Sequence, residues 1–327
     1  MFVGRSNSVN QQGNTPILKD RIGRVMRKLR VSLTDACNYR CFYCMPENSE
    51  FTPNQKLLKP EEYATICGRL VDLGIKEIRI TGGEPTVRPE FRAILSALTP
   101  FPIERRGVTS NGQLLARHLD FLWDFGWQHL NISLDSLDPG RFNRITHGGD
   151  FRVVLDCIEK AVRKGFVLKI NVVVFKGIND DELLDFANWS AITGIEVRFL
   201  EYMKIGPTYA SHWSRFISAQ EMMDQLETSM TLEPVLVPED STSFIFKTHL
   251  GGRLGFIASE SQPFCGQCSR LRLSATGDIR SCLMSERGFS LRGVPPDSYP
   301  EILERVMDLK PLGRLDHIEQ PMHAIGG

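Results

Sequence analysis

Short β-branched segments alternate with amphipathic segments of helical length through the first two thirds of the chain. The strand-like segments lie at 29–33, 77–81, 104–108, 129–133, 168–174 and 196–200. Segments 60–73 and 151–164 carry apolar residues at helical spacing and end at glycines, Gly74 and Gly165. This alternation is typical of repeated βα units around a parallel sheet.

Six such units without a clear seventh or eighth predict an α/β fold, an incomplete (βα)6 TIM-like barrel. Functional residues of such barrels lie in the loops at the C-terminal ends of the strands. After residue 207 the pattern changes to a helix at 218–227, strand-like runs over 233–280 and a last helix at 299–309. We therefore expect a flexible N-terminal extension over 1–20, the barrel over 21–210, and a smaller C-terminal α+β domain over 211–327.

The composition is that of a globular protein, with 42% hydrophobic and 24% charged residues among 327. Lys and Arg total 39, as do Asp and Glu, so the net charge gives no general attraction to nucleic acid or anionic membranes. No apolar run is long enough to span a membrane. We expect a cytoplasmic protein; whether residues 1–20 are a degraded organelle-targeting segment stays open.

Five of the eight cysteines fall in two close-spaced groups, which suits a metal in a reducing compartment better than disulfides. Cys37, Cys41 and Cys44 have the spacing C-x3-C-x2-C directly after the first strand. A structural zinc ion requires four ligands, whereas a cubane iron–sulfur cluster with three cysteines keeps one iron open. A zinc loop that borrows a distant His, or three reduced thiols in a turn, remain as alternatives.

The first cysteine loop, with Tyr43 before its last cysteine, resembles the cluster loop of the radical SAM superfamily. That resemblance implies a 4Fe–4S cluster whose open iron binds S-adenosylmethionine (SAM), and a 5′-deoxyadenosyl radical made by one-electron cleavage of SAM. The segment Thr81-Gly82-Gly83-Glu84-Pro85 after the second strand resembles the site for the SAM amino group. There Gly83 permits close backbone approach, and Glu84 offers acceptors for an ammonium group. Ser133, at the end of the fourth strand, resembles a SAM contact.

The second cysteine group, Cys265, Cys268 and Cys282, again offers three ligands, although a zinc knuckle lacking its fourth ligand is an alternative. Arg270 and Arg272 alternate on a predicted strand, so both point to one face, where paired guanidinium groups suit phosphate oxygens. A solvated basic edge strand is the alternative. More cations are expected at the barrel mouth, and unpaired burial there would require a ligand: Arg30, Arg79, Lys169 and Arg198.

These features together are similar to the GTP 3′,8-cyclase family of molybdenum cofactor biosynthesis, over nearly the whole chain from Asp20 onward. The resemblance implies two 4Fe–4S clusters, the first on Cys37, Cys41 and Cys44 and the second on Cys265, Cys268 and Cys282. It implies SAM contacts at Tyr43, Gly83, Ser133 and Met203. It implies GTP contacts at Arg30, Arg79, Thr109, Lys169, Arg270, Leu271 and Arg272, with the terminal Gly326 and Gly327 reaching into the active site.

The same resemblance implies conversion of GTP to 3′,8-cyclo-7,8-dihydro-GTP, with an electron donor of flavodoxin or ferredoxin type and a downstream cyclic pyranopterin monophosphate synthase as partners. A homodimer stays open. Two rival functions remain: a radical SAM peptide maturase with auxiliary clusters, and a non-catalytic iron–sulfur electron carrier. The maturase is disfavoured because such proteins use more late cysteines than the three found here.

Overall fold

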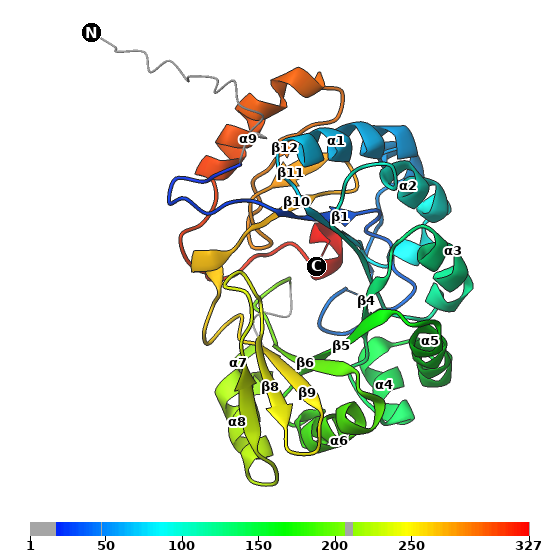
Figure 1. Ribbon diagram of the computed structural model, residues 1–327, viewed down its shortest axis with the longest axis vertical. Helices are drawn as coiled ribbons and strands as arrows, with labels where there is room; N and C mark the ends of the chain where they lie inside the picture. The colour runs from blue at the N-terminus through cyan, green and yellow to red at the C-terminus, as the bar shows by residue number, and fades with distance from the viewer. Residues whose placement is uncertain (1–17, 47, 207–211, 327) are drawn as a thin grey trace.

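The computed structural model describes residues 18–46, 48–206 and 212–326. Its sheet contains twelve strands (Figure 1), which are β1 Lys28–Ser32, β2 Glu77–Thr81, β3 Arg105–Ser110, β4 His129–Ser133, β5 Val167–Val174, β6 Glu196–Glu201, β7 Leu232–Val235, β8 Phe244–Thr248, β9 Arg253–Ile257, β10 Arg270–Leu273, β11 Asp278–Arg280 and β12 Phe289–Ser290. Its helices are α1 Pro60–Asp72, α2 Phe91–Leu98, α3 Leu119–Asp124, α4 Pro139–Thr146, α5 Phe151–Lys164, α6 Leu183–Thr193, α7 His212–Arg215, α8 Ala219–Glu227 and α9 Tyr299–Asp308.

Strands β1 to β6 are parallel and adjacent in chain order, as the six predicted βα units require. Helices α1 to α6 cover the outer side of this curved sheet, and the C-terminus lies on its concave side (Figure 1). The sheet order runs from β12 to β7 without returning on itself, so the barrel is open, as expected. The predicted segments agree with the observed elements to within one or two residues.

The C-terminal segment extends the barrel sheet at both edges, which the sequence does not predict. Strand β10 pairs in parallel with β1 and continues to β11 and β12, whereas β9 pairs in parallel with β6 and continues to β8 and β7. All strands after the expected boundary at residue 210 therefore belong to the same sheet as the barrel strands. The second cysteine group flanks β10 and so lies beside the first strand of the barrel.

Hydrophobic and polar positions alternate along the barrel strands. In β1, Leu29 and Val31 are buried in the core, while Arg30 between them is only partly buried. In β5, Leu168, Ile170 and Val172 are buried in the same way. Because successive side chains point to opposite faces, the apolar ones pack under the helices and the charged ones face the barrel interior.

Local signals fix the helix ends. Helix α5 begins after Asp150, whose carboxylate accepts hydrogen bonds from the backbone of Arg152 and Val153, and it ends at Gly165 with φ +91°. Upstream of the barrel, Leu18 packs against the core and Asp20 is buried, while residues 1–17 of the expected extension lie outside the described residues. No helix in the described part of the chain is long and apolar enough to cross a membrane.

Candidate active site

The first cysteine loop leaves the C-terminal end of β1 and is anchored to the end of α4. The backbone amides of Arg40 and Phe42 donate to the carbonyls of Thr146 and Ile145, at 3.0 and 3.2 Å. The Cys37 thiol accepts from the Tyr39 amide at 3.4 Å and from the Asn111 side chain at 3.8 Å. The loop therefore lies where functional residues of a parallel barrel are expected.

Burial dominates the ionisation of these three thiols. It raises the pKa of Cys37 to about 11 and that of Cys44 to about 12, and it raises the pKa of Cys41 well above its usual value. For Cys41 and Cys44, a neighbouring cysteine of the loop is the next cause, so the sulfurs are close enough for their charges to interact. The raised pKa values favour the thiol form, so a metal group that binds these cysteines as thiolates would release their protons.

No three His, Cys, Asp or Glu side chains in the described part of the chain are grouped as ligands of a single metal ion. Within each cysteine group, the charges of the thiols nevertheless influence one another. Three protein thiols without a fourth ligand are the donor set of a cubane cluster that keeps one iron open, so the first loop fits such a cluster.

The Gly82-Gly83-Glu84 turn after β2 packs directly against the cysteine loop. The Gly83 amide donates to the Thr34 carbonyl at 2.7 Å, and the Glu84 amide donates to the Ala36 carbonyl at 2.9 Å. A Cβ at Gly83 would lie 2.4 Å from the carbonyl oxygens of both Asp35 and Ala36. The glycine is therefore required by close contact between two backbones, apart from any contact with a ligand.

Glu84 does not offer its carboxylate to a ligand, contrary to the expectation from sequence. The side chain is buried and accepts hydrogen bonds from the Thr86 amide and hydroxyl, the Ser110 hydroxyl and the Asn111 amide, at 2.5 to 3.1 Å. Burial raises the pKa of this carboxyl group. Glu84 ties the end of β2 to the end of β3, which holds the turn against the cysteine loop.

Tyr43 and Ser133 lie on the same side of the barrel as the cysteine loop. The Tyr43 hydroxyl donates to the Asp135 carboxylate at 2.7 Å, and Asp135, two residues beyond Ser133, also accepts from the Val173 amide at 2.8 Å. Burial raises the pKa of Asp135 to about 6. Sequence reasoning missed Asp135 as the residue that fixes the Tyr43 ring.

The second cysteine group surrounds the start of β10. Cys265 begins a short 3-10 turn, Cys265–Gln267, Cys268 follows it, and Cys282 comes after β11. The guanidinium of Arg270 donates to the Cys268 sulfur at 3.4 Å through both Nε and Nη2. Although burial would raise the pKa of Cys268, the charges of Arg270 and Lys310 outweigh it and lower that pKa to about 6.

Two buried cations that the sequence did not single out hold this second group. Lys310 is 2% exposed, and its ammonium donates to the carbonyls of Arg270 and Ser281, both at 2.8 Å, with the Cys268 sulfur at 3.7 Å. Arg24 pairs with Asp20 and donates to the carbonyls of Cys265 and Pro311, at 2.5 and 2.8 Å. Residues from both ends of the chain thus fix the segments that carry the three cysteines.

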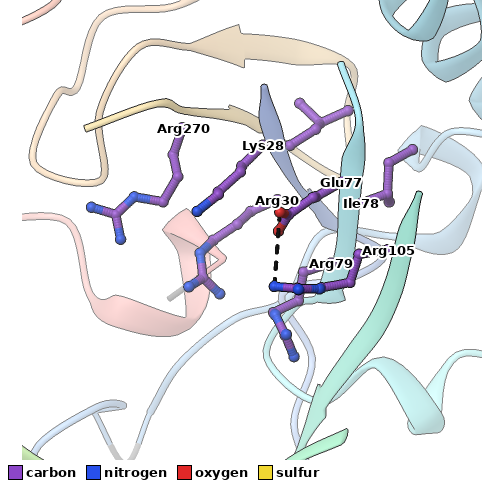
Figure 2. A pocket seen from close by; sticks show the side chains of 8 residues that line it. Lys28, Arg30, Glu77, Ile78, Arg79, Arg105 and Arg270 are labelled. Carbon is purple, nitrogen blue, oxygen red and sulfur yellow. Dashed lines mark ion pairs between the residues drawn. The ribbon is translucent and has the colours of Figure 1, made fainter. Parts of the chain in front are cut away.

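Inward-facing arginines form a row across neighbouring strands. Arg272, Arg30 and Arg79 are register partners across β10, β1 and β2, and Gly107 of β3 is the next position in the row. A Cβ at Gly107 would lie 3.0 Å from the Arg79 Nη1 atom, so a larger residue would crowd that guanidinium. Figure 2 shows Arg30, Arg79 and Arg270 extending from three strands into one space.

This cationic space opens at the N-terminal ends of the strands, not at the C-terminal mouth where the sequence places it. Its lining includes Lys28, Glu77 and Arg105, the first residues of β1, β2 and β3 (Figure 2). Leu271, expected to contact GTP, is fully buried in the core, so its side chain faces away from this space. The barrel therefore carries its cysteine loop and its cationic opening at opposite ends.

Several buried polar atoms in the barrel lack a hydrogen-bond partner among the described residues: Arg30 Nε, Arg79 Nη1, Thr109 Oγ1 and Asn171 Oδ1. Burial, followed by repulsion from Arg272, Arg270, Arg79 and Arg198, lowers the pKa of Arg30 well below its usual value. Burial also lowers the pKa of Arg79 and that of Arg272 to about 10. A polyanion bound here would accept from the two guanidinium groups and the Thr109 hydroxyl and remove the repulsion, whereas Asn171 Oδ1 would require a ligand donor.

Lys169 and Arg198 share one carboxylate, Glu196, which sequence reasoning missed. Lys169 Nζ lies 2.9 Å and Arg198 Nε lies 2.7 Å from Glu196 Oε1. Burial would raise the pKa of Glu196, but these two cations lower it. Lys169 is therefore paired within the protein, unlike Arg30 and Arg79, and a ligand phosphate would compete with Glu196 for it.

The C-terminal tail enters the concave side of the sheet (Figure 1) and touches both cysteine-bearing regions. The Gly326 carbonyl accepts from Arg272 Nη1 at 2.6 Å and from the Thr81 hydroxyl at 3.1 Å, while the His323 backbone hydrogen-bonds the Cys44 thiol. Gly326 has φ +68°, and a Cβ there would lie 3.0 Å from the Ser32 Cβ. Gly327 lies outside the described residues.

Met203 lies between the tail and the second cysteine group. It packs with Cys282 and Met322 against a small buried cluster of Ile205, Met284, Ile318 and Ile325. Met203 and Cys282 of the second cysteine group therefore pack against the same apolar cluster.

Family models match most of the chain. Residues 31–190 match the radical SAM superfamily, and residues 195–310 match Molybdenum Cofactor Synthesis C. A GTP 3′,8-cyclase of Synechocystis sp. is 42% identical over 310 residues, which cover 95% of each chain. A GTP 3′,8-cyclase of Listeria monocytogenes is 39% identical over 90% of this chain and 91% of its own. This chain belongs to the GTP 3′,8-cyclase family.

The family also includes a human relative of different length. Human molybdenum cofactor biosynthesis protein 1 is 42% identical over 84% of this chain, a match that covers 44% of the human protein. Among solved structures, Streptococcus suis SuiB bound to SAM superposes with a TM-score of 0.64 over 88% of this chain and 69% of its own, at 13% identity. That likeness confirms the open barrel fold.

As a member of the GTP 3′,8-cyclase family, the chain is an enzyme of the radical SAM type, and the first cysteine loop fits the cofactors of that superfamily. The roles assigned to single residues remain predictions. The sequence did not indicate the roles of four charged residues, because a single charged residue forms no motif. These residues are Lys310, Arg24, Glu196 and Asp135.

Proposed function

We propose that this chain converts GTP to 3′,8-cyclo-7,8-dihydro-GTP, the first step of molybdenum cofactor biosynthesis. In this reaction the ribose C3′ loses a hydrogen atom, a bond forms between C3′ and guanine C8, and one electron and one proton complete the product. The product therefore has the composition of GTP. Family membership at 42% identity over nearly the full chain supports this reaction.

We assign the first 4Fe–4S cluster to Cys37, Cys41 and Cys44, with SAM near Tyr43, Gly83, Ser133 and Met203. With SAM bound, that cluster supplies the one-electron reduction that releases the 5′-deoxyadenosyl radical. The chain contributes the orientation: Asp135 fixes the Tyr43 hydroxyl, and Glu84 holds the glycine turn against the cysteine loop.

We assign a second cluster to Cys265, Cys268 and Cys282, where an open iron would take the guanine base. Three cysteines, as in the first group, support this assignment. The low pKa of Cys268 also supports it, because a thiolate is the form that binds metal.

The observation that carries GTP as substrate is the row of inward cations, of which Arg30 and Arg79 have buried nitrogen atoms without partners among the described residues. Arg30, Arg79, Arg270, Arg272 and Thr109 would bind the triphosphate and ribose, with Lys169 exchanging Glu196 for a phosphate oxygen. Leu271 could contribute only its backbone, since its side chain is in the core. The tail at Gly326, with Gly327 beyond it, and the apolar cluster beside Met203 would exclude water from the reacting carbons.

The partners follow from the chemistry. Each turnover consumes two electrons, one to cleave SAM and one to complete the product, so a one-electron donor of flavodoxin or ferredoxin type is required. The cyclised nucleotide is the substrate for a downstream cyclic pyranopterin monophosphate synthase. A homodimer remains untested.

Anaerobic incubation of the reconstituted enzyme with SAM, dithionite and GTP tests the reaction. We expect 5′-deoxyadenosine and a cyclised nucleotide in equal amounts. Formation of 5′-deoxyadenosine at a rate independent of GTP, with no cyclised nucleotide, would refute the proposed substrate.

The variant Arg270→Ala/Arg272→Ala tests the phosphate contacts separately. It should weaken GTP binding by at least tenfold, roughly 1.4 kcal/mol, and leave SAM binding unchanged. Unchanged GTP affinity in equilibrium binding would contradict the role of this pair. A GTP-dependent change in the electron paramagnetic resonance spectrum of the second cluster would locate the base.

A further inference from the structure

A second pocket lies at the C-terminal end of the barrel, on the outer side of the first cysteine loop. It encloses about 480 Å³, and its apolar floor consists of Phe42, Ile145 and Ile178. Its charged lining consists of Arg141, Arg144 and Arg215, with His147 beside them. It lies at the opposite end of the barrel from the cationic opening of Figure 2, so it is separate from the substrate cations.

The pocket presents unneutralised positive charge. Arg141 is paired with Asp181 and Glu182, at 2.6 and 2.5 Å, and braces α4 against the loop after β5. Arg144 and Arg215 form no ion pair with any described residue, and no carboxylate among the described residues lines the pocket. Arg144 is exposed, so its charge is available to a partner from outside.

One apolar residue of the pocket, Phe42, belongs to the cluster loop. Phe42 stands between Cys41 and Cys44 in sequence, and its ring contacts Tyr43 and Phe175, with centroids 5.6 and 5.0 Å away. The Arg215 guanidinium lies over the same ring, 4.9 Å from its centroid. A molecule that fills the pocket therefore contacts the residue that separates two cysteines of the first group.

We infer that this pocket is the docking surface for an acidic electron-carrier protein that reduces the first cluster, an inference that rests on the proposed function. Transfer of one electron breaks a carbon–sulfur bond of SAM, and a carrier of one-electron type is oxidised in the same step. Electron transfer weakens steeply with distance, so the carrier must approach the cluster loop. Weak, charge-steered contacts are typical of redox encounters.

A small anion is a poorer occupant of this pocket. Buried polar atoms without partners mark the cationic opening, but none of those found in the described residues belongs to a residue lining this pocket. The charges without ion pairs are on the exposed Arg144 and the partly buried Arg215, whereas Ile145 among the apolar lining residues is buried. That arrangement of polar rim and apolar centre is typical of a surface that meets another protein.

The test compares two reductants in the reconstituted enzyme with SAM. Reduced flavodoxin, an acidic carrier, must dock, whereas dithionite is a small reductant that needs no docking surface. Arg144→Glu and Arg144→Glu/Arg215→Glu should lower the flavodoxin-driven rate of 5′-deoxyadenosine formation roughly tenfold or more at low salt. The dithionite-driven rate should stay unchanged, and added salt should slow the unmodified enzyme more than the variants.

The matched control is Arg152→Glu/Arg287→Glu, which reverses two exposed charges outside the pocket. Iron content is measured in every variant. The single variant Arg144→Glu is included because the exposed Arg144 side chain forms no ion pair with any described residue, so its replacement should not disturb folding. If the pocket variants and the control variant show the same flavodoxin-driven rate of 5′-deoxyadenosine formation, the pocket is not the docking surface. Failure of dithionite to drive SAM cleavage in the unmodified enzyme would instead overturn the proposed function.

Discussion

Replacement of Lys310 by Met would remove the buried cation that joins the two segments of the second cysteine group. The Lys310 ammonium donates to the carbonyls of Arg270 and Ser281, both at 2.8 Å, and lies 3.7 Å from the Cys268 sulfur. Met has a similar length and keeps the apolar packing, so the change isolates the charge and its hydrogen bonds.

The expected cost follows from those contacts. Two hydrogen bonds from a charged donor contribute about 3–6 kcal/mol in total. Burial of the ammonium, which lowers the pKa of Lys310, offsets part of this gain. We expect a net loss of about 2–3 kcal/mol in the free energy of unfolding, which corresponds to a fall of roughly 3–4 °C in Tm for a chain of 327 residues.

The charge also acts on the neighbouring thiol. Arg270 and Lys310 together outweigh burial and lower the Cys268 pKa from 9.0 to about 6. Ionisation of Cys268 therefore stabilises the folded, cluster-free protein fully above pH 9, and this stabilisation is lost as pH falls from 9 to 6. In Lys310→Met the Cys268 pKa should rise, so stability should vary less with pH across this range.

Thermal unfolding at several pH values and the rate of Cys268 alkylation measure the two effects. At pH 6 a rise of about one unit in the Cys268 pKa should slow alkylation roughly fivefold. The control is Lys247→Met, the same substitution at an exposed lysine. An unchanged pH profile of Cys268 alkylation in Lys310→Met would refute the electrostatic reasoning.

Three further changes test the rest of the site. Gly83→Ala should destabilise the protein by about 2–4 kcal/mol and reduce its iron content, because the new Cβ would lie 2.4 Å from two carbonyl oxygens; normal melting and iron content would contradict the close-contact argument. Arg30→Met should raise the stability of the ligand-free protein by about 1 kcal/mol, since it removes a partly buried cation that its neighbours repel, yet weaken GTP binding in titration calorimetry; a lower Tm would count against the repulsion. Thr81→Val removes the hydroxyl that donates to the Gly326 carbonyl at 3.1 Å, so amide hydrogen exchange over 318–326 should accelerate roughly fivefold; unchanged exchange would mean that this bond does not hold the tail.

Local patterns in the sequence determined the barrel strands, the helices and the first cysteine loop. The strands are recognisable because their apolar positions face the helices with a period of two, as in β5. Helix α1 begins at a proline and ends just before Gly74, and α5 begins after Asp150 and ends at Gly165. Cys37, Cys41 and Cys44 lie within eight residues of one another, so their spacing alone indicates a shared metal group.

Only the tertiary structure decided how the C-terminal segment completes the site. Strand β10 pairs with β1 and β9 with β6, and no local pattern fixes pairings between strands so far apart in sequence. The same long-range pairing sets Arg272 beside Arg30 and turns Leu271 into the core. Lys310 and Arg24 gain their roles because folding buries each beside backbone carbonyls that are far from it in sequence, and Lys310 also beside the Cys268 thiol.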